Sequence, residues 1–215
     1  NRLTSVQRLE ITSTNTPLER LLDASLEQDI DIIRRTKETV SHEAFYSAAD
    51  ALVQAKRVYI IGAGSSLALA TFLAHYMSLV FDAVQLINAT SEAQILQQIV
   101  HIGPGDALIG ISFPRYSKKA AKALRYASDR GASVIAITDS TLSPLASCAQ
   151  QVLLAKSDMV SFVDSLVGPL ALINALIVTV AIKKKDEVAK TLCDLENIWD
   201  EYGVYEKVEN KSDDL

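Results

Sequence analysis

Two short segments of the sequence combine hydroxyl side chains with features that bind anions. Gly62-Ala63-Gly64-Ser65-Ser66 places two serines beside glycines, and residues 112–117, Ser-Phe-Pro-Arg-Tyr-Ser, place serines at both ends of a segment that holds an arginine. Glycine lets a backbone approach an anion closely, and hydroxyl and guanidinium groups donate hydrogen bonds to phosphate oxygens. The candidate phosphate-binding residues are Gly64, Ser65, Ser66, Ser112, Arg115 and Ser117.

Both segments follow short apolar runs that have the pattern of buried strands. Such runs occur at 58–61, 83–87, 107–111, 134–137 and 152–154, and stretches of helical character separate them. Continuous apolar strands between helices predict an α/β fold, with a five-stranded parallel sheet covered on both faces. In such a sheet, ligands bind beyond the carboxyl ends of the strands, where a helix start adds free N–H groups. The two serine segments are therefore expected at the same edge.

The first segment has two other possible interpretations. A dinucleotide-binding fingerprint needs glycine at position 67, which is Leu67, and the second strand ends at Asn88 without a ribose-binding acid. A nicotinamide-dependent oxidoreductase is therefore not expected, and no cofactor is predicted. A glycine turn that only packs a strand against a helix stays open as an alternative. Cys148 and Cys193 lie far apart without a histidine pair, so no metal site is predicted.

The region before the first strand predicts two helices. Residues 1–15 are rich in Thr, Ser and Asn and are expected to be a linker or a frayed start. Thr16-Pro17-Leu18-Glu19 combines a capping box with proline at the first helical position, and Ser41 begins a second apolar-faced segment. Residues 16–56 should thus form an N-terminal helical arm. After the fifth strand we expect helices over 161–185 and through Trp199, then a polar tail at 206–215.

Composition excludes several classes of protein. Of 215 residues, 49% are hydrophobic and 22% are charged, which is typical of a globular protein. A net charge of −5 has the wrong sign for a domain that covers DNA phosphates. The uncharged run 166–182 is interrupted by Gly168 and Pro169, so a buried helix is expected and no membrane span. The sparse cysteines favour the cytoplasm, and the start at Asn1 without a signal sequence suggests a piece of a longer protein.

Residues 57–205 resemble the sugar isomerase (SIS) domain, specifically the effector domain of RpiR-family transcriptional regulators. The matching motifs are Gly62-Ala63-Gly64-Ser65-Ser66, Ile111-Ser112-Phe113-Pro114-Arg115-Tyr116-Ser117, Ile137-Thr138-Asp139-Ser140, Ser143-Pro144-Leu145-Ala146 and Glu201-Tyr202-Gly203-Val204-Tyr205. The resemblance implies an αβα sandwich of the flavodoxin-like or Rossmann-like kind, a homodimer or tetramer, and a phosphorylated sugar as ligand. It places Ser65 and Ser66 in the first phosphate loop and Ser112 and Ser117 at the outer hydroxyls of the second.

The second loop departs from that of the family's enzymes. SIS enzymes tend to begin this loop with Ser-x-Ser-Gly, whereas this chain has Pro114 and Arg115 at the last two of these positions. The resemblance therefore implies sensing and not turnover, so an enzyme is not expected. A sugar phosphate isomerase is the alternative. It would need a base, for which Glu92 is the best-placed candidate, although Glu92 is expected rather to complement a helix start or to contact sugar hydroxyls.

RpiR-type regulators also carry a helix-turn-helix domain before the SIS domain. Residues 1–56 have neither room for that module nor its basic charge, so it is expected upstream of Asn1 or removed. DNA binding would then belong to the parent protein. The predicted function of this chain is sugar phosphate sensing and dimerisation, with the helix over 166–182 and the N-terminal arm as candidate dimer contacts. The identity of the sugar and the direction of regulation stay open.

Overall fold

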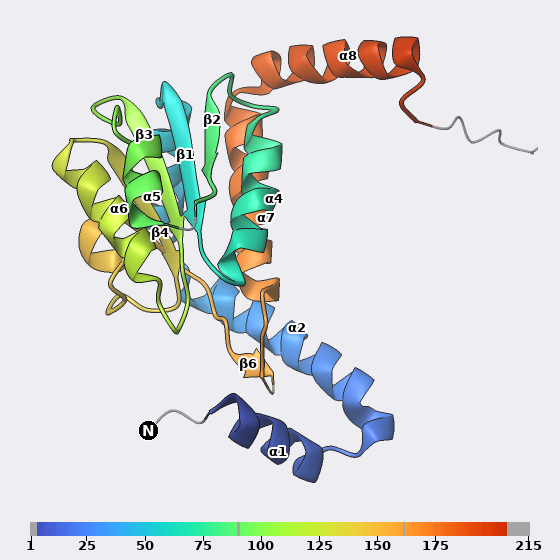
Figure 1. The fold of residues 1–215 in the computed structure, drawn as a ribbon. Helices are drawn as coiled ribbons and strands as arrows, with labels where there is room; N and C mark the ends of the chain where they lie inside the picture. The colour runs from blue at the N-terminus through green and yellow to red at the C-terminus, as the bar shows by residue number, and fades with distance from the viewer. Residues whose placement is uncertain (1–3, 90, 161, 206–215) are drawn as a thin grey trace, which may run out of the picture.

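Five strands form a parallel sheet at the centre of the computed structural model, which describes residues 4–89, 91–160 and 162–205 (Figure 1). The sheet order is β2-β1-β3-β4-β5, and every neighbouring pair is parallel. All five apolar runs that predicted strands are confirmed. The strands are β1 (Arg57–Gly62), β2 (Val84–Ile87), β3 (Asp106–Ile111), β4 (Ser133–Thr138) and β5 (Gln151–Leu154).

The middle of the sheet sets the position of the candidate loops. β1 and β3 are neighbours, and Gly62 at the end of β1 pairs with Ile111 at the end of β3. The chain runs outward from β1 to β2 on one side and then returns to β3 on the other, so the strand order reverses between β1 and β3. Ligands of open parallel sheets bind at such a switch point, beyond the carboxyl ends of the strands.

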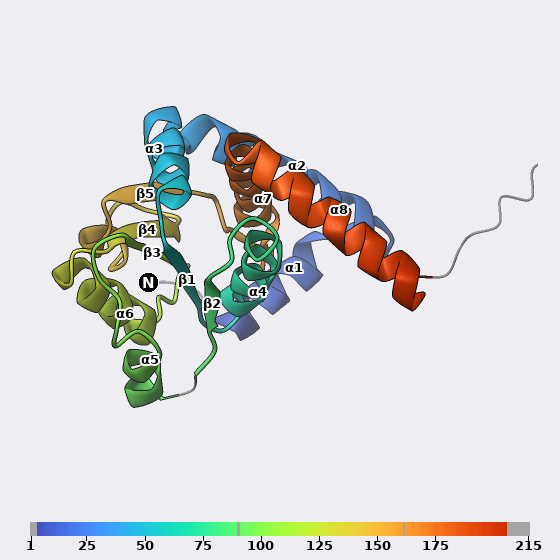
Figure 2. The ribbon, with the colours of Figure 1, turned by 90° about the horizontal axis from the view of Figure 1, so that it is seen from above.

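Helices cover both faces of the sheet, as the apolar strands predict (Figure 2). On one face, α3 (His42–Val53), α4 (Ser66–Met77) and α7 (Val167–Lys183) pack into one apolar core with the sheet. On the other face, α5 (Glu92–Gln98) and α6 (Lys118–Asp129) pack into a second core. The predicted αβα sandwich is therefore confirmed.

The uncharged run 166–182 lies within the buried helix α7. Its apolar side chains Leu172, Ile173, Leu176 and Val180 are buried in the core. Among the described residues, no single helix is long and apolar enough to cross a bilayer. Only the pair formed by α7 and the next helix, α8 (Lys185–Tyr202), has sufficient length and composition, and the two bend by 100° at their junction.

Residues 1–15 are expected from the sequence to be a linker or a frayed start, and the expected fraying is wrong for the residues that the structure describes. Ser5–Asn15 form a helix, α1. Thr4 and Gln7 explain it, because the Thr4 hydroxyl accepts from the Gln7 N–H at 3.2 Å and the Gln7 side chain accepts from the Thr4 N–H at 2.9 Å. This is a complete capping box, which satisfies two N–H groups at the helix start.

The helical arm follows α1. A single 3₁₀ turn, η1 (Leu18–Arg20), starts after Pro17, and the α-helix α2 (Leu21–Thr39) continues from it. The helix predicted to begin at Thr16-Pro17 thus begins as a tighter turn. The predicted start at Ser41 is confirmed, since the Ser41 hydroxyl accepts from the Ala44 N–H at 3.2 Å and caps α3.

A two-stranded antiparallel hairpin lies between β5 and α7. Its strands are β6 (Met159–Val160) and β7 (Val163–Asp164), and α7 begins only at Val167. The prediction of a helix from residue 161 is therefore wrong by about one and a half turns, because backbone pairing in the hairpin replaces the first turns of the helix. The predicted polar tail at 206–215 lies outside the described residues.

Candidate functional site

A cavity of about 570 Å³ opens at the carboxyl edge of β1 and β3. Its volume is within the usual range for small-molecule sites. The loop after β1 and the loop after β3 form part of its wall, together with Asp139 after β4, residues of the β5–β7 segment, and the start of α1. Both serine segments thus meet at one site, as predicted from their positions at the carboxyl ends of parallel strands.

The first loop brings the start of α4 against the end of β1. Gly64 adopts φ +60°, a left-handed conformation that favours glycine. A Cβ atom on Gly62 would lie 2.4 Å from the Ser66 carbonyl oxygen, so only glycine allows this close approach. Ser66 is buried, with 3% of its surface exposed, and is the first residue of α4. The Leu67 and Ala68 N–H groups of this helix start donate to the Gly64 and Ser65 carbonyl oxygens at 3.1 and 3.2 Å, which fixes the loop against α4.

Ser65 does not close this helix start. Its side chain makes no capping hydrogen bond to α4 and instead donates to Asp164 Oδ2 of β7 at 2.8 Å. The loop is thereby fixed to the hairpin, while the α4 amino terminus is left without a side-chain cap. Such a terminus carries a partial positive charge and suits an anion.

The second loop holds its two serines in different roles. Ser112 is 3% exposed, and its hydroxyl accepts from the Ser117 N–H at 3.0 Å. The Ser117 hydroxyl accepts from the Ala120 N–H at 3.2 Å and caps α6. Ser112 and the exposed Arg115 line the cavity, whereas Ser117 does not. The Pro114–Arg115 peptide bond is cis.

Three carboxylates also line the cavity. Asp139 Oδ1 accepts from the Tyr116 hydroxyl at 2.8 Å, and Asp164 accepts from Ser65. Asp158 pairs with Arg35 of α2, with 2.5 Å between Oδ2 and Nη2. Hydrogen bonding to Asp158 raises the pKa of Arg35 above its ordinary value, so this guanidinium stays charged and offsets the charge of Asp158.

Glu92, the candidate base or sugar contact, does not line the cavity. It lies in the first turn of α5, and both its carboxylate oxygens accept from Lys122 Nζ of α6, at 2.7 and 2.9 Å. This pair joins two helices on the second face of the sheet. The structure of this chain therefore separates Glu92 from the two serine loops.

Sequence reasoning missed the contribution of the N-terminal segment. Thr4, which caps α1, and Ser5 and Arg8 of α1 line the cavity, although this segment is expected from the sequence to be a linker or a frayed start. The threonine at position 4 with glutamine three residues later is a capping signature and was the available signal. Ser157 and Asp158 line the cavity as well, and nothing in their local pattern indicates it.

No metal centre accompanies the site in the described residues. Within 4–89, 91–160 and 162–205, no group of three or more His, Cys, Asp or Glu side chains is arranged to hold a metal ion. None of the three histidines lines the cavity.

Comparison with known families gives this site a context. The model of the SIS domain matches residues 51–179, which is more than half of the chain. The chain belongs to the SIS domain family. The match spans the whole sheet and both serine loops, so the resemblance stated from those loops is confirmed.

The curated relatives of this SIS domain are regulators by name. An uncharacterized HTH-type transcriptional regulator of Caldanaerobacter subterraneus subsp. tengcongensis is 28% identical over 166 residues, which cover 74% of this chain and 57% of that protein. The chain spans about half the length of the curated relatives it matches.

Solved structures share the fold across most of this SIS domain. The sugar isomerase domain of an RpiR transcription factor from Sphaerobacter thermophilus is 29% identical with a TM-score of 0.78, covering 83% of this chain and 99% of that one. The NanR protein of Vibrio vulnificus, complexed with ManNAc-6P, is 19% identical with a TM-score of 0.73, covering 90% and 74%. Phosphoheptose isomerase GmhA of Neisseria gonorrhoeae is 19% identical with a TM-score of 0.65, covering 76% and 98%. The fold therefore serves both regulators and isomerases.

Proposed function

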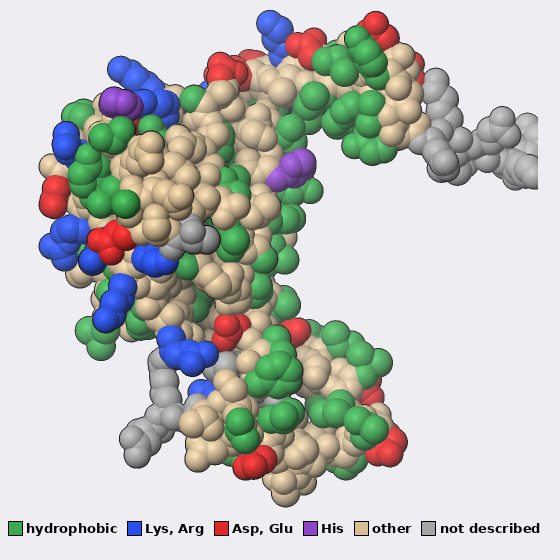
Figure 3. All heavy atoms as spheres, viewed as in Figure 1, with side chains coloured by type: hydrophobic (Ala, Val, Ile, Leu, Met, Phe, Trp, Pro, Cys, Tyr) green, Lys and Arg blue, Asp and Glu red, His purple; other side chains and the backbone are tan. Residues whose placement is uncertain are grey.

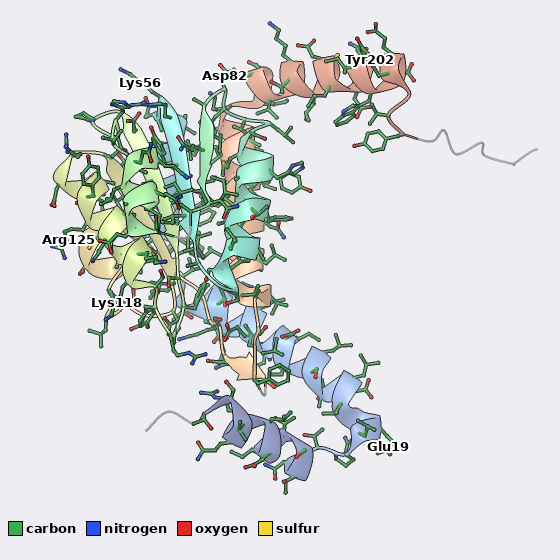
Figure 4. All side chains as sticks on the ribbon, in the orientation of Figure 1. Glu19, Lys56, Asp82, Lys118, Arg125 and Tyr202 are labelled. Atoms are coloured by element: carbon green, nitrogen blue, oxygen red, sulfur yellow. The ribbon has the colours of Figure 1, made fainter. Side chains whose placement is uncertain are left out.

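We propose that this SIS domain binds a phosphorylated sugar and acts as the effector domain of an RpiR-type transcriptional regulator in the cytoplasm. The observation that carries the proposal is the convergence of the uncapped α4 start with Ser66, Ser112 and Arg115 on one cavity. Figure 4 labels Lys118, the residue with which α6 begins after the second loop. The named regulators among the relatives and the ManNAc-6P complex of NanR support it.

The phosphate group would bind between the two serine loops. Ser66 and Ser112 present buried hydroxyls beyond adjacent strand ends, and the α4 amino terminus adds the positive end of its helix dipole. Arg115 adds a guanidinium that suits paired phosphate oxygens. The sugar would then extend toward Asp139 and Asp164, whose carboxylates can accept hydrogen bonds from hydroxyl groups.

Sensing fits the described lining better than turnover. Moving a proton between adjacent sugar carbons needs a base within reach of the substrate. The described lining contains no glutamate and no histidine, and each of its three aspartates is hydrogen-bonded or ion-paired within this chain. Glu92 is held by Lys122 outside the cavity. The alternative, a sugar phosphate isomerase, has the shared fold in its favour.

We also propose that two copies of the domain associate through the flank formed by α4, α7, α8 and α2. Apolar side chains are exposed along this flank, and Figure 3 shows them gathered between α8 and α2. Exposed apolar surface of this extent is unusual for a monomer. The exposed residues include Leu22, Leu26, Ile30, Tyr76, Val178, Ile182 and Ile198. Binding of a ligand would then bias the arrangement of the two copies and of any DNA-binding domains attached to them.

Molar mass in solution tests this assembly. Light scattering behind a sizing column should give a dimer or a tetramer, and Val178→Glu, which puts a charge at the centre of the apolar flank, should reduce the mass. Ser128→Ala on α6, on the opposite face, should leave it unchanged. A monomer of the unaltered chain would refute the proposal.

A thermal-shift screen against a panel of sugar phosphates tests the ligand. A ligand at ~100 times its dissociation constant adds about 2.7 kcal/mol to the free energy of unfolding, which is readily seen as a higher melting temperature. Each hit is then incubated with the protein and followed by NMR. Stabilisation without conversion supports a sensor, and conversion would establish the isomerase instead. The absence of any shift would refute the phosphate site.

A further inference from the structure

The first helix has an unusual orientation for an amphipathic segment. Its apolar side chains Val6, Leu9 and Ile11 are 65%, 50% and 45% exposed, and no residue of α1 is buried. Arg8, by contrast, is half-buried and lines the cavity between the serine loops. The helix thus directs its arginine inward and its apolar residues outward, so burial of apolar surface within this chain does not hold α1 in place.

The second helix is fixed by other means. Ile32 is fully buried, and buried Thr36 accepts from the Lys156 N–H at 3.0 Å. Asp29 accepts from the Ser165 hydroxyl at 2.7 Å, and Arg35 pairs with Asp158. These contacts anchor α2 to the segment between β5 and α7. Between the anchored α2 and α1 stand only the residues around Pro17 and the short turn η1, which can serve as a pivot (Figure 1).

The charges of the cavity leave a role for Arg8. The described lining holds three aspartates and two arginines, Arg8 and Arg115, and one of the aspartates is already paired with Arg35. A phosphate monoester would add a charge of about −1.5 to −2 at pH 7. Arg115 alone would leave that charge poorly balanced beside Asp139 and Asp164. A second guanidinium, supplied from α1, reduces this excess of negative charge and offers two more directed donors.

We propose that Arg8 is a ligand-binding residue of this site, and that α1 is the element that a phosphorylated ligand holds in place over the cavity. This inference rests on the proposed sugar phosphate function and adds a coupling element to it. A bound ligand would fix α1 through Arg8, and with it the direction in which the chain leaves toward its N-terminal end. A ligand shifts such an equilibrium only through its differential affinity for the two states, and the contact with Arg8 exists only when α1 is docked.

Two probes and three variants test the inference. The probes are inorganic phosphate and ManNAc-6P, and their dissociation constants are measured by calorimetry for the unaltered chain, Arg8→Ala, Arg8→Lys and the control Arg125→Ala. Loss of a charge-assisted hydrogen bond should raise the dissociation constants of Arg8→Ala about 10-fold or more, with a smaller increase for Arg8→Lys. Arg125 is exposed on α6 and lies outside the cavity lining, so Arg125→Ala should bind as the unaltered chain does.

Hydrogen exchange of residues 5–15 gives the second readout. The probes should slow exchange of α1 in the unaltered chain and in Arg125→Ala, but not in Arg8→Ala. An equal melting temperature of the ligand-free proteins shows that Arg8→Ala is folded, as expected for a helix without buried residues. If Arg8→Ala binds both probes as tightly as the unaltered chain while Ser66→Ala with Ser112→Ala does not, the inference about Arg8 is wrong and the proposed function stands. If the unaltered chain binds neither probe nor any other sugar phosphate, both are wrong.

Discussion

The two serine loops occupy equivalent places at the ends of adjacent strands, but only one of them caps the helix that follows it. In the loop after β3, Ser117 caps α6 and thereby satisfies the start of its own helix. In the loop after β1, Ser65 makes no cap and binds Asp164 instead, so no side chain covers the start of α4. One loop therefore offers a helix terminus to a ligand, and the other offers a hydroxyl and a guanidinium.

The largest effect is expected at the close approach in the first loop. Gly62→Ala would place a Cβ atom 2.4 Å from the Ser66 carbonyl oxygen, so the start of α4 must shift away from β1. We expect a loss of about 2 to 3 kcal/mol in the free energy of unfolding, measured by urea denaturation, and loss of sugar phosphate binding. Gly103→Ala is the matched control, because its Cβ would meet nothing closer than 3.9 Å. Equal stability of the two variants would contradict this account of the first loop.

Removal of the buried hydroxyl at the start of α4 should weaken ligand binding. Ser66→Ala deletes a donor from the cavity wall without disturbing any capping bond, since the cap position is Ser65. The dissociation constant for a sugar phosphate should rise about 10-fold or more, while the melting temperature of the free protein changes little. Calorimetric titration checks the affinity, with Ser128→Ala as a control remote from the site. An unchanged affinity would mean that α4 does not contact the phosphate.

Ser117→Ala should reduce the stability of the protein more than its affinity for the ligand. Loss of the α6 cap should reduce the free energy of unfolding by about 1 kcal/mol, and affinity for the ligand should fall less than it does in Ser66→Ala. Ser117→Asn keeps a capping side chain and should recover most of the stability. A binding defect as large as that of Ser66→Ala, with full stability, would show that Ser117 contacts the phosphate as the resemblance implied.

The smallest effect is expected at the bond that fixes the first loop to the hairpin. Ser65→Ala removes a hydrogen bond between an exposed hydroxyl and Asp164, so the free energy of unfolding should fall by only about 0.5 kcal/mol. Asp164→Asn keeps an acceptor oxygen and serves as the partner control. Chemical denaturation measures both. A loss as large as that of Gly62→Ala would mean that the hairpin, and not the close approach of strand and helix, positions the loop.

The sheet and the edge that carries the site follow from local patterns in the sequence. Apolar runs predicted all five strands, and the rule for parallel sheets then placed Ser66, Ser112 and Arg115 together. The contribution of α1 did not follow, because its apolar residues are exposed and no local pattern places Arg8 in the cavity. The places of Asp139 and Asp164 in the site did not follow either, because tertiary contacts with Tyr116 and Ser65 establish them.

Glu92 is a residue that the sequence suggested for the site and that tertiary packing places outside it. Its position just after β2 suggested the same edge of the sheet, and its placement in the first turn of α5 agrees with the expected helix start. The sequence does not show that α6 presents Lys122 to it, at 2.7 Å, on the second face of the sheet. The distance between residues 92 and 122 along the chain makes this pair a product of tertiary packing.

Calorimetric titration with a sugar phosphate found by the screen, and with the same sugar lacking phosphate, tests the central claim most directly. The comparison is made on the unaltered chain and on Ser66→Ala combined with Ser112→Ala. We expect the phosphorylated sugar alone to bind the unaltered chain, and the double variant to bind it about 100-fold more weakly or not at all. Equal affinity for the two sugars, or an unchanged affinity in the double variant, would contradict a phosphate site between the two loops.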